Sequence, residues 1–451
     1  MEDLAGFASF EKQRTEPDWV QHAIWWHVYP LGFVGAETIA EAKSKSHRIR
    51  RLIDWLEYVV ELGISGILLG PIFSSSTHGY DTIDYFEIDP RVGDCEDFLK
   101  LVKAAKDRGL RVILDGVFNH VGSGFPIFQD ALDAGGDTPG SRWFRRKRST
   151  NNVGLEAGYE NFEGHPNLIA LNHANSEVAE FVIRVMCHWL STGIDGWRLD
   201  AAYAVPTEFW AEVLHRVRAI FPQAYFVGEV IHGDYTSVVK RGGLDSVTQY
   251  EVWKAIWSSI NDRNFFELAW ALNRHNACLE SFVPMTFVGN HDVTRIASQI
   301  QDGRHLDHAM VILLTIGGTP SIYYGDEQAY RATKEHRVGG DDAIRPAFPE
   351  EGRAALAPCD WRMYRLHQQL IGLRRRNAWL HGAKTHIVQL GNTHFAYQSV
   401  WQNQRIVVAL NLDDKPMAFS FSQVNNLLLG EGTIQHDSHL VIPPNRWAVF
   451  A

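Results

Sequence analysis

The chain has 451 residues, of which 45% are hydrophobic, and a formal net charge of −10 at pH 7. This much apolar material excludes an intrinsically disordered protein and is enough for a large core. The acidic balance disfavours non-specific binding to nucleic acid or to an anionic membrane surface, so we expect neither as a partner.

The first residues carry acids at Glu2 and Asp3 and contain no apolar segment of the kind found in secretory signals. No stretch of the chain approaches 18 consecutive apolar residues, so we expect no transmembrane helix. Both features favour a cytoplasmic location.

Short apolar runs recur along the chain and are separated by longer helix-like segments. In chain order they are Ile24–Tyr29, Ile64–Leu69, Arg111–Asp115, Gly196–Asp200, Tyr225–Glu229, Ser246–Tyr250, Pro284–Val288 and Ser321–Tyr324. Three of the segments between them are amphipathic, and each ends at a glycine before the next strand. These are Ile49–Leu62 with Gly63, Asp94–Arg108 with Gly109, and Glu177–Thr192 with Gly193. Eight strand–helix repeats predict an α/β fold, a parallel (β/α)8 TIM barrel.

Two parts of the chain depart from this repeat. Residues 121–170 are rich in Gly, Asn, Pro and charge, which predicts a loop-rich inserted domain after the third strand. From residue 385 the pattern becomes alternating and β-rich, with turn signals such as Gly391-Asn392. We therefore expect a barrel formed by residues 1–120 and 171–384 and a small antiparallel, β-sandwich-like domain over 385–451. Its expected strands are Thr385–Leu390, His394–Ser399, Ile406–Leu412, Met417–Phe421 and Asp437–Phe450.

Polar residues end several of the predicted barrel strands, and this is the end at which TIM-barrel enzymes carry their chemistry. The strand ends read Asp115-Gly-Val-Phe-Asn119-His120, Arg198-Leu199-Asp200, Gly228-Glu229 and Gly289-Asn290-His291-Asp292. Burying so many charged groups is costly unless they pair or perform chemistry. The sequence therefore predicts one acidic bowl built from four strands.

The acids differ in their sequence surroundings. Arg198 and Asp200 are two residues apart on a strand, so both face the same side, and the arginine should keep Asp200 ionised as a nucleophile. The immediate neighbours of Glu229 carry no positive charge, so burial should raise its pKa, as a general acid requires. Two such carboxylates on adjacent strands are typical of retaining glycoside hydrolysis, with a separation of about 5–5.5 Å. Asp292 would complement positive charge in the transition state. His120 and His291 would donate hydrogen bonds to sugar hydroxyls.

The four strand-end motifs closely resemble those of the α-amylase family, glycoside hydrolase family 13. They are DGVFNH (Asp115–His120), GWRLDAA (Gly196–Ala202), GEV (Gly228–Val230) and FVGNHD (Phe287–Asp292). The segments His78–Asp94 and Gly317–Glu327 also resemble family signatures, and the likeness covers about residues 24–380. The resemblance implies that Asp200 is the nucleophile, Glu229 the acid/base and Asp292 the transition-state stabiliser in a double displacement that retains the α configuration.

The resemblance also implies a set of substrate-binding residues. Arg198 would orient the nucleophile, Tyr80 would stack on the sugar being cleaved, and Asp341 and Arg345 would grip the neighbouring sugar. The substrate-binding residues expected in full are Tyr80, Asp81, His120, Arg198, His291, Asp341 and Arg345.

A calcium site is less well supported. Many family members with calcium carry Lys-His shortly after the nucleophile, whereas this chain continues Ala201-Ala202-Tyr203-Ala204. Asn119, the other usual contributor, is present, but Ca²⁺ needs six to eight oxygens and few others are placed to supply them. We expect the chemistry to require no cofactor and take Asn119 as the candidate ligand of a structural Ca²⁺.

Three functions fit these features. The first is hydrolysis of α-1,4-linked malto-oligosaccharides. The second is transglycosylation or sugar isomerisation by the same chemistry, as in enzymes that make or rearrange trehalose- or sucrose-type sugars; residues after Glu229 (Ile231, His232, Gly233 and Asp234) would decide between water and sugar as acceptor. The third is a non-catalytic sugar-binding relative, against which the intact Asp200, Glu229 and Asp292 speak. We expect a neutral α-glucan or oligosaccharide as substrate, and a homo-oligomer is compatible with these features.

Overall fold

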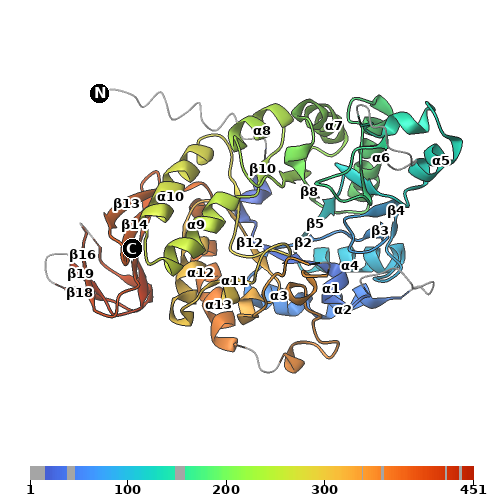
Figure 1. Ribbon diagram of the computed structural model, residues 1–451. Helices are drawn as coiled ribbons and strands as arrows, with labels where there is room; N and C mark the ends of the chain where they lie inside the picture. Colours follow the sequence, from blue (N-terminus) through green and yellow to red (C-terminus); the bar gives the residue numbers. More distant parts are fainter. Residues whose placement is uncertain are drawn as a thin grey trace.

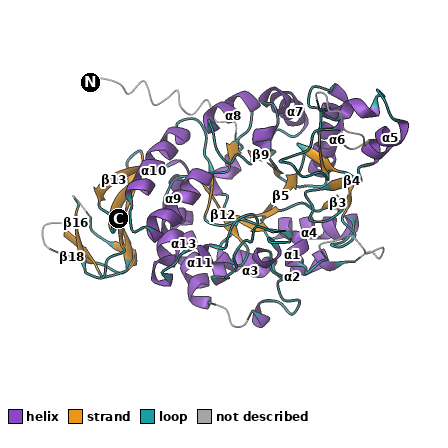
Figure 2. Cartoon of the chain, viewed as in Figure 1, coloured by secondary structure: helices purple, strands orange, loops and turns teal. Residues whose placement is uncertain are grey.

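The computed structural model places a ring of strands at the centre, helices around it, and two smaller sheets at one side (Figure 1). Figure 2 shows the same arrangement by secondary structure. The residues that the structure describes are 16–37, 46–147, 158–337, 339–356, 360–421, 424–435 and 439–451.

The central sheet has eight strands, and every pair of neighbours is parallel. Its order is β10-β9-β8-β5-β2-β1-β12-β11, and a parallel bridge between Thr248 and Met285 joins the two ends. The predicted (β/α)8 barrel is therefore confirmed. The strands are β1 (Trp25–Val28), β2 (Gly66–Leu69), β5 (Arg111–Gly116), β8 (Gly196–Leu199), β9 (Tyr225–Gly228), β10 (Ser246–Val247), β11 (Met285–Phe287) and β12 (Thr319–Tyr323).

Helices cover the outside of the ring and bury their apolar faces against it (Figure 2). They are α1 (Pro30–Phe33), α2 (Arg51–Asp54), α3 (Leu56–Leu62), α4 (Cys95–Asp107), α6 (Ser176–Ser191), α7 (Thr207–Ile220), α8 (Tyr235–Gly242), α9 (Tyr250–Asn261), α10 (Phe266–Leu279), α11 (Ile296–Gln299), α12 (Leu306–Thr315) and α13 (Trp361–Arg376).

The predicted helices Asp94–Arg108 and Glu177–Thr192 are confirmed as α4 and α6. The single helix expected over Ile49–Leu62 is wrong, because the segment is divided into a 3-10 turn, α2 and α3, with a break at Trp55. The buried Trp55 indole donates to the carbonyl of Pro349 (3.3 Å) and packs against Phe33 and Phe348. These contacts come from distant parts of the chain, so periodicity could not reveal the break.

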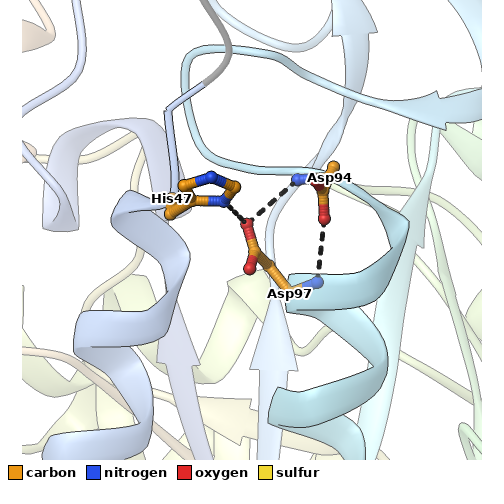
Figure 3. Close-up of side chains that lie close together, drawn as sticks. All are labelled: His47, Asp94 and Asp97. Atoms are coloured by element: carbon orange, nitrogen blue, oxygen red, sulfur yellow. Dashed lines mark hydrogen bonds and ion pairs between the residues drawn. The ribbon is translucent and has the colours of Figure 1, made fainter.

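The α4 cap cluster, formed by His47, Asp94 and Asp97, brings three potential metal ligands together (Figure 3). Asp94 accepts from the backbone amide of Asp97 (3.0 Å), and the Asp97 carboxylate reaches back to the amide of Asp94 (3.4 Å), which is a capping box. Asp97 also bonds Nδ1 of His47 (2.6 Å) and Nε of Arg50. Because Arg50 already places a cation on this carboxylate, the cluster caps α4 and ties it to the preceding segment.

The inserted segment leaves the barrel after β5 and is framed by β6 (His120–Gly122) and β7 (Leu168–Ala170), which pair antiparallel. Between them lie α5 (Pro126–Ala134) and the 3-10 turn Gly140–Trp143. The predicted domain limits at residues 121 and 170 stay predictions, and residues 148–157 lie outside the described part. A second excursion, the antiparallel pair β3 (Phe73–Ser75) and β4 (Thr82–Ile88), holds Tyr80 and Asp81 in its connecting turn.

The C-terminal part contains two antiparallel sheets, of orders β13-β14-β15-β20-β17 and β16-β19-β18. A core that includes Val407, Ala409, Phe419, Leu440 and Phe450 joins them. The single run expected over Asp437–Phe450 is wrong: two prolines, Pro443 and Pro444, separate β19 from β20, and Asp437 lies outside the described residues. The strands are β13 (Lys384–Leu390), β14 (His394–Trp401), β15 (Gln404–Asn411), β16 (Met417–Ser420), β17 (Leu427–Gly430), β18 (Thr433–Gln435), β19 (His439–Ile442) and β20 (Trp447–Phe450).

Candidate active site

Three carboxylates from neighbouring strands meet at the guanidinium of Arg198. Its Nη1 lies 2.8 and 2.9 Å from the two oxygens of Asp115 and 2.7 Å from Oδ1 of Asp200. Its Nη2 lies 2.7 Å from Oε1 of Glu229. The register explains this convergence, because Arg198 pairs directly with Asp115 on β5 while Asp200 and Glu229 follow the ends of β8 and β9. All four side chains are buried.

Glu229 contacts Arg198 directly. Its sequence neighbours carry no positive charge and could not show this contact, because the arginine projects from the adjacent strand. Burial nevertheless raises the pKa of the Glu229 carboxyl above its ordinary value, and Arg198 opposes that rise only partly. The carboxylate also accepts from the backbone amide of Ala201 and from the hydroxyl of Tyr250, both at 3.1 Å.

The charges in this cluster do not balance. Burial raises the pKa of Asp115 to about 8 and also raises the pKa of Asp200, although Arg198 lowers both. Arg198 favours the ionised form of Asp200, as expected, but burial outweighs its effect on the pKa, because one guanidinium is shared by three buried acids. Such an excess of acid favours retention of a proton within the cluster near neutral pH.

A second group of charges lies beyond the end of β11. The Asp292 carboxylate contacts Nη2 of Arg345 (3.1 Å) and Nε2 of His291 (2.9 Å). Burial alone would raise the pKa of Asp292, but His291 and Arg345 outweigh it and hold that pKa well below the usual range. Nη2 of Arg345 also donates to Oδ2 of Asp341 (3.2 Å), so the structure brings the predicted Asp341–Arg345 pair together.

Tyr80 connects the two groups. Its hydroxyl donates to Oδ2 of Asp115 (3.0 Å) and contacts Nε2 of His291. Its ring stacks on the imidazole of His291, with centroids 5.1 Å apart and planes 5° apart. Asp200, Glu229, Asp292, Arg198, Tyr80 and His291 therefore belong to one continuous network, and the predicted convergence of acids from three strand ends is what the structure contains.

His120 contacts the backbone of Tyr80, a member of this network. Its Nε2 bonds the carbonyl of Tyr80 (3.0 Å), and Nδ1 lies 3.1 Å from the amide nitrogen of Asn119. Burial lowers the pKa of His120 to about 4, so the ring is neutral, with Nε2–H donating and Nδ1 accepting. The described contacts make His120 a support for the Tyr80 backbone, and its predicted contact with sugar stays a prediction.

Asp81 has a different environment from the other predicted substrate-binding residues. Its two oxygens accept from the backbone amide (3.1 Å) and the hydroxyl (2.7 Å) of Thr77. The side chain is buried and braces the turn between β3 and β4. The described contacts thus give Asp81 a role in shaping the turn that presents Tyr80.

Sequence reasoning missed Tyr250 and Asn290. The Nδ2 of Asn290 donates to the Tyr250 hydroxyl (2.9 Å), which in turn donates to Glu229, and Oδ1 of Asn290 accepts from the amide of Asp292 (2.9 Å). Tyr250 ends the predicted strand Ser246–Tyr250, and Asn290 is part of the strand-end motif FVGNHD. Their positions at strand ends could therefore have identified them as candidate site residues. Only the fold could show that they join Glu229 to the Asp292 segment.

Asn119 offers little for a calcium ion among the residues that the structure describes. Its Oδ1 is buried without a hydrogen-bond partner, and its carbonyl accepts from the amide of Leu171. Within the described ranges, the α4 cap cluster is the one group of three or more His, Cys, Asp or Glu ligands close enough to share an ion, and Asn119 is not part of it. Asn119 would supply one of the six to eight oxygens that Ca²⁺ requires, and a calcium site there stays a prediction.

Comparisons with known proteins identify a family for this chain. The model of the α-amylase catalytic domain matches residues 43–383. A cyclomaltodextrinase from Geobacillus thermopakistaniensis (strain MAS1) is 30% identical over 471 residues, covering 96% of this chain and 78% of that protein. An intracellular maltogenic amylase from Bacillus subtilis is 29% identical over 437 residues, covering 91% of this chain and 70% of the relative. A solved debranching enzyme from Nostoc punctiforme aligns with a TM-score of 0.82 at 26% identity, covering 98% of this chain and 100% of the other.

The family match spans most of the chain and includes all four strand-end motifs that carried the resemblance. Across the described residues, no helix combines the length and apolar character needed to span a membrane. With a closed (β/α)8 barrel and a shared cluster of acids at its strand ends, the chain belongs to the α-amylase family and is a glycoside hydrolase.

Proposed function

We propose that this enzyme hydrolyses α-1,4-linked malto-oligosaccharides with retention of the α configuration. The observation that carries the proposal is the pair of contacts from one guanidinium, Arg198, to Asp200 and Glu229. Oxygens held by two nitrogens of the same group cannot lie far apart. This favours the separation of about 5–5.5 Å typical of retaining enzymes over the roughly 6.5–9.5 Å of inverting ones.

In the first step, Asp200 attacks the anomeric carbon and the glycosidic oxygen leaves with a proton from Glu229. Burial raises the pKa of Glu229 and so favours its protonated form, as a general acid requires. Nη1 of Arg198 stabilises Asp200 as the ionised attacking group. The products of this step are a glucosyl ester on Asp200 and a free leaving sugar.

In the second step, Glu229 is ionised and takes a proton from water as that water attacks the ester. The bond to Asp200 breaks, Asp200 regains its charge, and the sugar leaves with its original configuration. Asp292, kept ionised by His291 and Arg345, would complement the positive charge that develops on the sugar ring in both steps.

The substrate class rests on the chemistry of the site and on the relatives. The network has acids in excess, so it suits a neutral sugar rather than an anionic one. One relative is named for cyclomaltodextrin and another as a maltogenic amylase, which supports an α-glucan of maltose units. The word "intracellular" in the latter name also supports the cytoplasmic location that we propose.

The test is product analysis by chromatography after separate incubation with maltose, maltotriose, cyclodextrin, sucrose and trehalose, with NMR of the anomer released first. We expect shorter products from maltotriose and cyclodextrin, released as the α anomer. Products longer than the substrate would identify transfer instead, and a β anomer released first would overturn the retaining mechanism.

A further inference from the structure

A groove of about 470 Å³ lies beside the acid/base residue and outside the network described above. The segment after β9 forms one wall, and α9 and α10 form the other. Ile231, His232, Gly233 and Tyr235 line it from the first side, and Tyr250, Trp253, Lys254, Trp270 and Arg274 are among the residues that line it from the second.

One residue, Tyr250, links the groove to the catalytic network. Tyr250 lines the groove, and its hydroxyl donates to Oε1 of Glu229 at 3.1 Å. Ile231 and His232, on the opposite wall, follow Glu229 by only two and three positions. In the proposed mechanism Glu229 protonates the oxygen of the departing sugar, so a groove whose wall residue Tyr250 donates to this carboxylate is next to the leaving-group side of the bond.

An exposed tryptophan dominates the outer part of the groove. Trp270 on α10 keeps 60% of its surface exposed, a large fraction for an indole. The guanidinium of Arg274 lies 4.9 Å from its ring centroid. Ile231, on the facing wall, is 41% exposed. Flat apolar surface presented to solvent beside an active site is typical of a ligand-binding position.

The charges around the groove balance. Lys254 forms an ion pair with Glu267, and Arg274 lies 2.6 Å from Glu251. Two cations and two acids that pair with each other leave little net charge to attract an anionic ligand. They still offer hydrogen-bonding groups at the rim of an apolar floor. This combination fits a neutral polyhydroxylated chain whose C–H faces are apolar.

We propose that this groove binds the leaving-group end of an α-glucan chain, several sugars beyond the cleaved bond, with Trp270 as its stacking platform. The inference rests on the proposed function and deepens it, because it assigns a chain-length preference to that site. A chain held on α9 and α10 positions the leaving sugar against Glu229. The same groove also offers a binding place to a sugar acceptor in the second step.

The first experiment compares Trp270→Ala with the matched control Phe266→Ala on maltose, maltotriose and maltoheptaose. Phe266 is also on α10, is 51% exposed, and is not among the residues that line the groove. We expect Trp270→Ala to lower kcat/KM for maltoheptaose by about three- to tenfold, as the loss of one aromatic stacking contact predicts, and to leave maltose unaffected. Phe266→Ala should match the wild type on all three sugars. A chain-length profile of Trp270→Ala equal to that of the wild type would overturn the groove assignment.

The second experiment measures maltoheptaose binding by titration calorimetry in Asp200→Asn, with and without Trp270→Ala. Weaker binding in the double variant supports the groove even if no substrate is turned over, so it stands apart from the proposed activity. Equal binding overturns it while leaving the proposed hydrolysis intact. If Trp270→Ala changes the mass of the particle in sedimentation but not the chain-length profile, the surface is a contact between copies of the chain, and the groove assignment is likewise overturned.

Discussion

Two buried arginines in this molecule hold carboxylates in opposite ways. Arg91 is bidentate on one acid: its Nε lies 2.8 Å from Oδ1 of Asp89 and its Nη2 lies 2.6 Å from Oδ2. Nη2 of Arg91 also donates to the hydroxyl of Ser75 (2.7 Å). Arg198 is equally buried but is shared among Asp115, Asp200 and Glu229.

The difference separates a structural ion pair from a reactive one. The pair Arg91–Asp89 balances its charges and fixes the chain just after β4. The Arg198 cluster has three acids for one cation, and burial raises the pKa of each acid. A site that must gain and release a proton needs more acids than cations, because the excess raises the pKa of its carboxyl groups. The same excess in a structural ion pair would leave a buried charge without a partner and destabilise the fold.

The largest expected effect is that of Asp200→Asn. We expect a loss of activity of more than about 10⁴-fold, because the variant lacks the carboxylate that forms the ester in the proposed mechanism. The melting temperature should stay the same or rise, because the change removes one buried charge from an overcrowded cluster. Activity assays and thermal unfolding check both, and retained turnover would rule out Asp200 as the nucleophile.

Glu229→Gln should lose about 10²–10⁴-fold on maltotriose, as expected when a general acid is removed. The loss should be much smaller in the first step with α-glucosyl fluoride, because fluoride leaves without a proton. Stopped-flow release of fluoride measures the first step with α-glucosyl fluoride, and chromatography of the released sugars measures the rate on maltotriose. Equal losses on both would contradict an acid role for Glu229.

Exchanging Arg198 and Arg91 for lysine, one at a time, tests whether the first arginine serves catalysis and the second serves stability. Arg198→Lys should lower kcat by about 10²-fold or more, because one ammonium cannot bridge three carboxylates. Arg91→Lys should leave kcat within about twofold but lower the free energy of unfolding by about 1–3 kcal/mol, through loss of charge-assisted hydrogen bonds. Urea unfolding and initial rates on the two variants supply the readouts. If both changes had the same effects on kcat and on the free energy of unfolding, the distinction between a reactive and a structural arginine would be wrong.

Tyr250→Phe should have the smallest effect, a shift in pH dependence. The Tyr250 hydroxyl donates to the Glu229 carboxylate and so favours its ionised form, which lowers the pKa. Its removal should raise the pKa of Glu229 by about one to two units, since a hydrogen bond to a charged group contributes about 1.5–3 kcal/mol and 1.36 kcal/mol is one unit. Activity is lost as pH rises through the pKa of the acid, so the alkaline limb of kcat/KM should move to higher pH. A shift to lower pH would contradict this hydrogen-bond role.

Much of the barrel could be predicted from sequence, because buried parallel strands are short apolar runs and helices end at glycine. All three predicted glycines, Gly63, Gly109 and Gly193, have positive φ of 94°, 75° and 101°. The C-terminal strands β17 and β18 were not predicted, because they are largely exposed and lack an alternating pattern. The break at Trp55 depends on contacts far along the chain.

The candidate site also has a part that the sequence could predict and a part that it could not. The positions of Asp200, Glu229 and Asp292 at the ends of predicted strands were enough to predict that they meet. In a parallel barrel the carboxyl ends of all strands lie on the same face. Contacts that cross between strands, such as Arg198 to Glu229 or Tyr250 to Glu229, depend on register and side-chain direction, which one sequence does not encode visibly. Asp81 was grouped with the sugar-binding residues through its motif, and only coordinates place its carboxylate on Thr77.

The most direct test of the central claim is to trap the covalent intermediate. Glu229→Gln incubated with α-glucosyl fluoride should form the ester readily but release it slowly, because the base that activates water is gone. Peptide mass spectrometry should then find one added glucosyl group on the peptide that contains Asp200, and none on that peptide in Glu229→Gln/Asp200→Asn. A glucosyl group on Asp115 or Asp292, or no adduct while fluoride is still released, would contradict the account.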